Sequence, residues 1–335
     1  MSLTSNPAEC QGIVISKSTG AYAVQSLVSP LPVKEDGAVA APPAGEVGWC
    51  TLTARLRPEQ VVVGDVVRFR PTAGQAVAGQ IVDVLPRRNQ LARRGVASRA
   101  GAHAFQQVIV ANVDQVLPVL AAASPAPRWN LLDRYLALAE SIPLPSLIVI
   151  TKADLAPAAH PGDDDFYSAL DDYRRLGYPV VLTSAHSGAG LGPLRAALAG
   201  RASVLLGKSG VGKTSLLNAL EPGLGQRVSA VSAATGKGRH TTSQVQFFPL
   251  AGEGGGALVD TPGTREFGLW DVPAGELALY FREMRPLLGQ CKFGLDCRHD
   301  SEPGCAIRRA VMAGAISPRR YQSYRRLQEE TGETV

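Results

Sequence analysis

Residues 207–214 read Gly-Lys-Ser-Gly-Val-Gly-Lys-Thr, directly after the apolar run Ser203–Leu206 and at the start of a helical pattern over Thr214–Leu220. The octapeptide matches Gly-x-x-x-x-Gly-Lys-Ser/Thr, in which backbone N–H groups wrap around phosphate oxygens at a helix N-terminus. Lys213 is expected to reach the β- and γ-phosphates, and the Thr214 hydroxyl to bind Mg²⁺. The sequence therefore predicts a nucleoside triphosphate site. Its expected binding residues are Gly207, Lys208, Ser209, Gly210, Val211, Gly212, Lys213, Thr214 and Ser215.

Two later segments complete the expected phosphate site. Asp260-Thr261-Pro262-Gly263 follows the apolar run Ala257–Val259, so Asp260 is expected to hold the Mg²⁺ water shell and the Gly263 N–H to meet the γ-phosphate. The glycine-rich segment 236–243 lies between this motif and the P-loop and is suited to be a switch loop. Either Thr241 or Thr242 is expected to complete the Mg²⁺ shell, and the sequence does not choose between them.

A base-recognition pattern precedes the P-loop. Thr151-Lys152-Ala153-Asp154 follows the apolar run Leu147–Ile150 and resembles the guanine tetrad Asn/Thr-Lys-x-Asp. Asp154 is expected to accept hydrogen bonds from guanine N1 and N2, a donor pair that adenine lacks, while Lys152 lies against the base plane. Thr151 is expected to brace the P-loop. A backbone N–H of the Ser184-Ala185 pair is expected to meet guanine O6. Together these motifs predict GTP rather than ATP.

The order of the motifs predicts a circular permutation. In ordinary GTPases the P-loop comes before the base tetrad, whereas here positions 151 and 184 precede position 207. Apolar strands alternate with helical stretches over residues 105–270, including strands expected at Val108–Val113 and Gln115–Leu120. This alternation predicts a parallel sheet with helices on both faces. Switch movement could then act directly on residues 271–335, which follow the γ-phosphate sensor in the chain.

Residues 11–95 predict a small antiparallel barrel. An oligonucleotide-binding (OB-like) barrel and an SH3-like barrel both fit the pattern, and residues 31–47 form a Pro/Ala/Gly-rich insertion within it. A basic cluster follows, which is either a solvated face or a contact for RNA phosphates; its members are Arg87, Arg88, Arg93 and Arg94. The expected strands are Gly12–Ser16, Ala21–Ser26, Cys50–Leu56, Asp65–Arg70 and Gly79–Leu85.

Three cysteines and a histidine cluster near the C-terminus in the pattern Cys291-x5-Cys297-x-His299-x5-Cys305. Three thiolates and one imidazole form a standard tetrahedral set for a structural zinc ion. Four protein ligands close the site, so no zinc catalysis is expected. Cys10 and Cys50 have no such neighbours and are expected to be ordinary barrel residues.

Composition narrows the class of protein. The chain has 335 residues, 45% of them hydrophobic, and a net charge of +5, which favours an anionic partner. No apolar run approaches the length of a membrane span, and no signal peptide is visible, so a cytoplasmic protein is expected. An odd count of five cysteines argues against a disulfide framework. The expected units are a barrel over 1–100, a permuted GTPase domain over 101–270 and a mainly α-helical zinc domain over 271–335.

Nearly the whole chain resembles the bacterial small-ribosomal-subunit-dependent GTPase A family. Besides the motifs above, the matching phrases are Gly238-Arg239-His240-Thr241-Thr242, Glu302-Pro303-Gly304-Cys305, Val63-Gly64-Asp65, Pro86–Leu91 and Ala111–Asp114. The resemblance implies a monomeric late maturation factor that binds the small ribosomal subunit and its 16S-type rRNA, which stimulates hydrolysis of GTP to GDP and phosphate. The insertion at 31–47, Thr151 in place of the commoner Asn, and Thr264 after the Asp-Thr-Pro-Gly motif depart from the family pattern.

Thr264 is too short to orient the attacking water as the Gln of classical GTPases does. His240 is then the favoured residue for positioning the water, beside Lys213 and Gly263 in the catalytic set. The alternative is that the ribosome supplies the missing group or orders the loop. Two other functions remain open from the sequence: a non-catalytic module whose GTP-bound form grips rRNA, and a metabolic or signalling GTPase without an RNA role.

Overall fold

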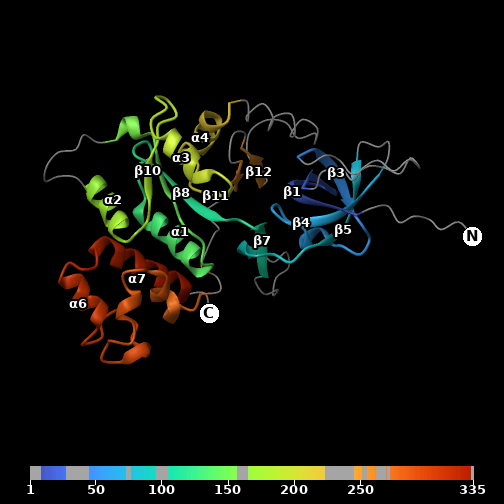
Figure 1. Ribbon diagram of the computed structural model, residues 1–335. Helices are drawn as coiled ribbons and strands as arrows, with labels where there is room; N and C mark the ends of the chain where they lie inside the picture. Colours follow the sequence, from blue (N-terminus) through green and yellow to red (C-terminus); the bar gives the residue numbers. More distant parts are fainter. Residues whose placement is uncertain are drawn as a thin grey trace, which may run out of the picture.

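The computed structural model describes residues 9–27, 45–72, 77–95, 105–156, 165–222, 245–250, 255–261, 269 and 272–332 (Figure 1). Within these ranges the chain forms a barrel, a helix-covered sheet and a C-terminal helical region. In Figure 1 the barrel lies beside the edge of the central sheet formed by β12 (Gln246–Pro249), whereas the C-terminal region lies below the helices α1 (Trp129–Ser141) and α2 (Asp165–Arg175). None of the helices in the described ranges has the length and apolar character needed to cross a membrane.

The N-terminal barrel has five strands in the order β1-β2-β3-β5-β4, and β4 pairs back with β1 to close it. β3 runs parallel to β5, whereas the other pairs are antiparallel, which is the arrangement of the oligonucleotide-binding barrel and confirms that expectation over the SH3-like one. Cys10 and Cys50 are buried in the barrel core and unbridged, as expected. The strands are β1 (Cys10–Ser18), β2 (Ala21–Ser26), β3 (Val47–Leu52), β4 (Val66–Pro71) and β5 (Val77–Val84), with a short 3-10 helix η1 (Pro58–Gln60). Most of the 31–47 insertion lies outside the described residues.

A hairpin of β6 (Gln90–Gly95) and β7 (Phe105–Ala111) lies between the barrel and the central sheet. The expectation that residues 108–113 form a strand of the parallel sheet is wrong. Asn112 takes a left-handed φ of 56° and ends β7 there. Its side chain binds the carbonyl of Gly64 and the N–H of Arg88, which ties this part of the chain to the barrel.

The central sheet confirms the α/β architecture. Its order is β10-β9-β8-β11-β13-β12, with all neighbours parallel except the β13–β12 pair. Leucines of α3 and α4 pack on one face, and α1 and α2 cover the other. The strands are β8 (Gln115–Ala121), β9 (Ile148–Thr151), β10 (Val180–Leu182), β11 (Ala202–Leu206), β12 (Gln246–Pro249) and β13 (Ala257–Asp260). The helices are α1 (Trp129–Ser141), α2 (Asp165–Arg175), α3 (Leu191–Leu198) and α4 (Lys213–Leu220), with η2 (Ala153–Leu155).

The C-terminal region packs against α1 through a shared apolar core that includes Tyr135, Phe281, Met284 and Tyr324. A buried charge network strengthens this contact, because Arg320 binds Asp133 of α1 at 2.6 Å and Glu283 at 2.8 Å. The region is therefore fixed to the central domain rather than tethered to it. Its elements are η4 (Ala274–Tyr280), η5 (Arg285–Leu287), η6 (Gly294–Asp296), α6 (Ala306–Met312) and α7 (Pro318–Gly332).

Candidate nucleotide site and metal centre

The P-loop connects β11 to α4, as its sequence predicts. Gly210 and Gly212 have left-handed φ values of 83° and 93°, where other residues are strained. A Cβ on Gly207 would lie 2.6 Å from the carbonyl oxygen of Val119, so only glycine fits next to β8. These requirements explain why the tight turn of the loop needs glycine at these three positions.

Lys213 and Asp260 lie close enough for their charges to interact. The Lys213 ammonium donates to the carbonyls of Gly207 (2.6 Å) and Lys208 (3.2 Å), so it lies inside the loop. Burial lowers the pKa of Lys213, and the charge of Asp260 opposes this shift. Burial likewise raises the pKa of Asp260, and Lys213 opposes that shift. Each charge therefore opposes the pKa shift that burial causes in the other group.

One oxygen of Asp260 is unsatisfied. Oδ1 is buried and has no hydrogen-bond partner among the described residues. The adjacent Thr261 hydroxyl donates to the Leu205 carbonyl at 3.0 Å, which ties the end of β13 to the P-loop strand. A buried carboxylate oxygen without a donor, beside the P-loop lysine, suits the water shell of a magnesium ion.

The predicted base tetrad is tied to the P-loop. The Thr151 hydroxyl lies between the carbonyls of Val211 and Leu120, the latter at 3.1 Å. Lys152 has a φ of 54° and donates to the Gly210 carbonyl at 3.0 Å and to that of Ser124. The bracing role expected of Thr151 is thus present in the structure. Lys152 therefore extends along the P-loop.

Asp154 lies at the open edge of this site and is held by Ser184. The hydrogen bond from Ser184 lowers the pKa of Asp154. The Ser184 oxygen also accepts the N–H groups of His186 (3.2 Å) and Ser187 (3.1 Å), which fixes its position. Sequence reasoning missed this link between the two base motifs. The only indication in the sequence is that both motifs are expected to bind the same base at one edge of the sheet.

The two backbone N–H groups of the Ser184-Ala185 pair differ in their hydrogen bonding. The Ser184 N–H donates to the Ala189 carbonyl at 2.9 Å, whereas the Ala185 N–H has no hydrogen-bond partner among the described residues. Ala153 of the tetrad donates to the Thr183 carbonyl at 3.0 Å, so the two motifs pack together. The structure thus brings the tetrad, the Ser-Ala pair, the P-loop and Asp260 to the carboxyl ends of neighbouring strands. His240, Thr241, Thr242 and Gly263 lie outside the described residues.

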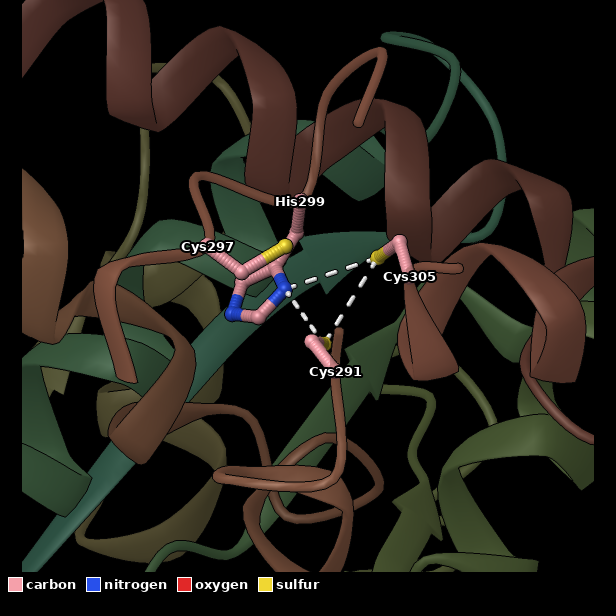
Figure 2. A group of neighbouring side chains, drawn as sticks. All are labelled: Cys291, Cys297, His299 and Cys305. Carbon is pink, nitrogen blue, oxygen red and sulfur yellow. Dashed lines mark hydrogen bonds between the residues drawn. The ribbon is translucent and has the colours of Figure 1, made fainter. Parts of the chain in front are cut away.

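The four predicted metal ligands converge in the C-terminal region (Figure 2). Their ligand atoms lie within 4.8 Å of one another, and all four residues are buried. His299 Nδ1 lies 3.5 Å from the sulfurs of both Cys291 and Cys305, which are 4.0 Å apart. A zinc ion with usual bond lengths requires edges of about 3.5 Å for N···S and about 3.8 Å for S···S. The set therefore fits tetrahedral zinc.

Backbone groups support the metal ligands. Cys305 caps α6, and its sulfur faces the N–H of Arg308 at 3.5 Å. The Ala306 N–H lies 3.3 Å from the Cys291 sulfur. The Tyr321 hydroxyl donates to the His299 carbonyl at 2.6 Å, which joins the cluster to α7. Such donors stabilise thiolate ligands and fix their orientation.

The comparisons with known proteins agree with this geometry. The family model RsgA GTPase matches residues 84–270. A Gemmatimonas aurantiaca protein named small ribosomal subunit biogenesis GTPase RsgA is 47% identical over 292 residues, which cover 85% of this chain and 91% of that protein. The protein of the same name from Azotobacter vinelandii is 44% identical over 88% of this chain and 80% of its own. The chain belongs to the RsgA GTPase family.

Two solved structures are similar to this chain over nearly its whole length, and one of them is described as circularly permuted. YjeQ from Thermotoga maritima matches with a TM-score of 0.69 and 32% identity, over 97% of this chain and 99% of that one. YloQ, described as a circularly permuted GTPase, matches with a TM-score of 0.68 and 27% identity, over 98% and 96%. As a member of the RsgA GTPase family, the protein is a GTP hydrolase with a permuted domain, which excludes the non-catalytic module.

The predicted RNA-contacting arginines differ in their surroundings. Arg87 forms a two-pronged ion pair with the fully buried Asp65, at 2.7 and 2.9 Å, and also binds the Gln60 carbonyl. The side chain of Arg88 is 65% exposed and pairs with Asp114 at 2.9 Å. Arg93 and Arg94 belong to β6, and their side chains lie outside the described residues. Arg87 therefore joins the barrel to the segment leading into β6, a structural role that its sequence neighbours do not reveal.

Proposed function

We propose that this RsgA-family GTPase acts in late maturation of the small ribosomal subunit, binds the subunit and its 16S-type rRNA, and hydrolyses GTP faster when bound. The observation that carries the proposal is the joining of a permuted GTP site, an oligonucleotide-binding barrel and a Cys3His cluster in one chain. A relative that is 47% identical over 85% of this chain is named for small ribosomal subunit biogenesis.

Guanine would be read by the two motifs at the open edge of the sheet. Asp154, whose pKa is lowered by the hydrogen bond of Ser184, would accept the N1–H and N2–H donors. The Ala185 N–H, which has no partner among the described residues, would donate to O6. Lys152 would lie along the base. Adenine offers an amino group where guanine offers O6, so the donor of Ala185 would reject it.

The phosphates would occupy the P-loop, with Lys213 drawn from the loop carbonyls to the β- and γ-oxygens. Asp260 and the Thr214 hydroxyl would hold Mg²⁺, which supplies charge neutralisation on the β- and γ-phosphates. Thr241 or Thr242 would complete that shell, and the Gly263 N–H would contact the γ-phosphate. The unsatisfied Oδ1 of Asp260 supports this assignment.

The attacking water would be positioned by His240, because Thr264 is too short for that role. The alternative is a group or a loop conformation provided by the ribosome, which would account for stimulated turnover. Replacing His240 by Ala separates the two: His240 as the positioning residue predicts a loss of both basal and stimulated hydrolysis, whereas the ribosomal alternative predicts that stimulation persists.

The barrel and the C-terminal region would contact the subunit. The exposed guanidinium of Arg88 and the β6 arginines 93 and 94 would bind rRNA phosphates, whereas Arg87 is already engaged by Asp65. One zinc ion would hold the Cys3His loop. Switch movement would reach this region through the chain that follows Gly263. The protein would act as a monomer in the cytoplasm. Its three units would span residues 1–100, 101–270 and 271–335.

Co-sedimentation with purified ribosomal subunits tests this function. The protein loaded with a non-hydrolysable GTP analogue should sediment with small subunits and not with large ones, and loading with GDP should weaken the association. A protein that remains in the supernatant with both subunits in both nucleotide states would contradict the ribosomal role while leaving the GTPase assignment intact.

A further inference from the structure

A groove separate from the nucleotide site lies between the start of α1 and the exposed side of α7. Its volume is about 310 Å³, and three arginines line it: Arg128, Arg319 and Arg326. No carboxylate is among its lining residues, which otherwise include the amides of Asn130 and Gln322. The groove therefore concentrates positive charge and hydrogen-bond donors in one concave surface.

The three arginines differ in whether their guanidinium groups already have partners in the protein. Arg319 is anchored, because it donates to the Tyr173 hydroxyl at 2.7 Å, lies 3.3 Å from Asp172, and stacks over the Trp129 ring at 5.4 Å. Arg128 and Arg326 are exposed, and their guanidinium groups have no ion-pair or hydrogen-bond partner among the described residues. Two unpaired guanidinium groups thus flank one that is already held in place.

We propose that this groove binds the phosphate backbone of RNA. Planar guanidinium groups match phosphate oxygens in two-pronged hydrogen bonds, and the neighbouring amides suit sugar and phosphate oxygens. An acidic peptide is disfavoured because peptide docking relies on apolar anchor pockets, and Pro127 and Trp129 are the apolar residues among those that line the groove. The inference rests on the proposed function, which supplies rRNA as the ligand, and it adds a contact far from the barrel arginines.

The groove adjoins the nucleotide site through a short segment. Pro127 and Arg128 also line a second cavity, of about 140 Å³, whose other wall includes Lys208, Ser209 and Val211 of the P-loop. A phosphate bound by Arg128 would therefore contact residues 127–128, which also line the cavity beside the P-loop. By thermodynamic reciprocity, nucleotide that shifts this segment must alter RNA affinity, and RNA must alter nucleotide affinity by the same factor.

The test uses the full-length protein and a short fluorescent RNA hairpin of arbitrary sequence, titrated at several salt concentrations. The double variant Arg128→Ala/Arg326→Ala should bind the hairpin about tenfold more weakly. The slope of log affinity against log salt should fall by about 1.4 to 1.8, the counterion release of two phosphate contacts. Both side chains are exposed, so the thermal unfolding midpoint should match that of the wild type.

Arg309 provides the matched control. It is an exposed arginine of α6 with no side-chain partner among the described residues, and it lies outside the groove lining. Arg326→Glu should weaken RNA binding, whereas Arg309→Glu, with the same change of charge, should leave both affinity and salt slope near wild type. Equal losses in the two variants would mean that net charge alone matters, and the groove would lose its assignment.

Three further results bear on the inference. Unchanged hairpin affinity and slope in the double variant would overturn it. Polyglutamate binding that is tighter than hairpin binding, and that Arg326→Glu abolishes while RNA binding persists, would assign the groove to an acidic protein and also overturn it. Hairpin binding that depends on Arg128 and Arg326 supports the groove even if the protein fails to bind small subunits, a failure that would count against the proposed function alone.

Discussion

Lys213 is held inside the phosphate loop by the carbonyls that surround it. Lys213→Ala should reduce GTP hydrolysis by at least about 100-fold, because the transferred phosphoryl group loses its main side-chain cation. Phosphate release by the purified variant measures this, with circular dichroism as the check on folding. Turnover at the wild-type rate would exclude this P-loop as the catalytic site.

Asp154 is the residue that we propose selects the base. Asp154→Asn should weaken GTP binding about 10- to 100-fold and improve binding of xanthosine triphosphate, because an amide donates to the xanthine carbonyl where a carboxylate cannot. Ser184→Ala should weaken GTP binding less and leave the base preference unchanged. Equilibrium binding of both nucleotides to both variants measures this. An unchanged base preference in Asp154→Asn would mean that residues 151–154 form an ordinary turn.

The pH dependence of that site follows from the hydrogen bond of Ser184, which lowers the pKa of Asp154. A carboxyl with a lowered pKa remains ionised throughout the neutral range and loses its charge only as the pH falls through that lowered value. The contribution of Asp154 to guanine selectivity should therefore be constant near neutrality and be lost in acid. Ser184→Ala should move this loss to higher pH.

Arg87 and Arg88 are adjacent in sequence and opposite in role. Arg87→Ala should lower the free energy of unfolding by about 3 to 5 kcal/mol, because the buried carboxylate of Asp65 loses its partner. Arg88→Ala should change it by about 1 kcal/mol or less, since that pair is exposed. Chemical denaturation of the two variants makes the comparison. Equal effects would show that the Asp65 pair does not hold the barrel to the segment leading into β6.

At the scale of elements, helix α6 begins directly after Cys305, which is both its N-cap and a predicted metal ligand. Zinc removal should expose residues 285–310 to solvent exchange, because Cys305 caps α6 and its partner ligands hold the preceding loop. Hydrogen exchange should show this loss there and little change in α1. The untreated protein should contain one zinc ion per chain. A fully metal-free protein with an intact 285–310 region would contradict the structural role of the site.

Local sequence patterns predict the elements whose conformation is determined by residues close together in the sequence. The P-loop follows from three glycines at spacings that the turn itself requires. The helical pattern over Thr214–Leu220 and the strand expected at Gln115–Leu120 agree with α4 and β8 to within one residue at either end. The apolar residues of 108–113 fit either sheet, so the sequence pattern does not distinguish the parallel sheet from the pair that β7 forms with β6. The Asn112 side chain, which follows β7, donates to the Gly64 carbonyl and ties this part of the chain to the barrel. The pairing of Arg320 with Asp133 and the link from Ser184 to Asp154 join distant positions, which periodicity does not encode.

At the scale of the whole molecule, the three regions are joined by specific contacts. β12 pairs with β1 at Gln246 and Ser16, which links the edge of the GTPase sheet to the barrel. Arg320 fixes the C-terminal helices to α1, and Glu140 of α1 pairs with Arg282 at 2.6 Å and Arg285 at 2.9 Å. The GTPase domain thus contacts both proposed RNA-binding ends, which is the arrangement that coupling between RNA and GTP requires.

Multiple-turnover phosphate release, measured with purified small subunits, with large subunits and with neither, tests the central claim most directly. We expect small subunits to accelerate GTP hydrolysis at least about tenfold, because a bound partner can order the segment that carries the proposed water-positioning residue His240 or supply a group of its own. Large subunits should have no effect, and Lys213→Ala should abolish the accelerated rate. The same slow rate under all three conditions would contradict a GTPase that is activated by the small ribosomal subunit.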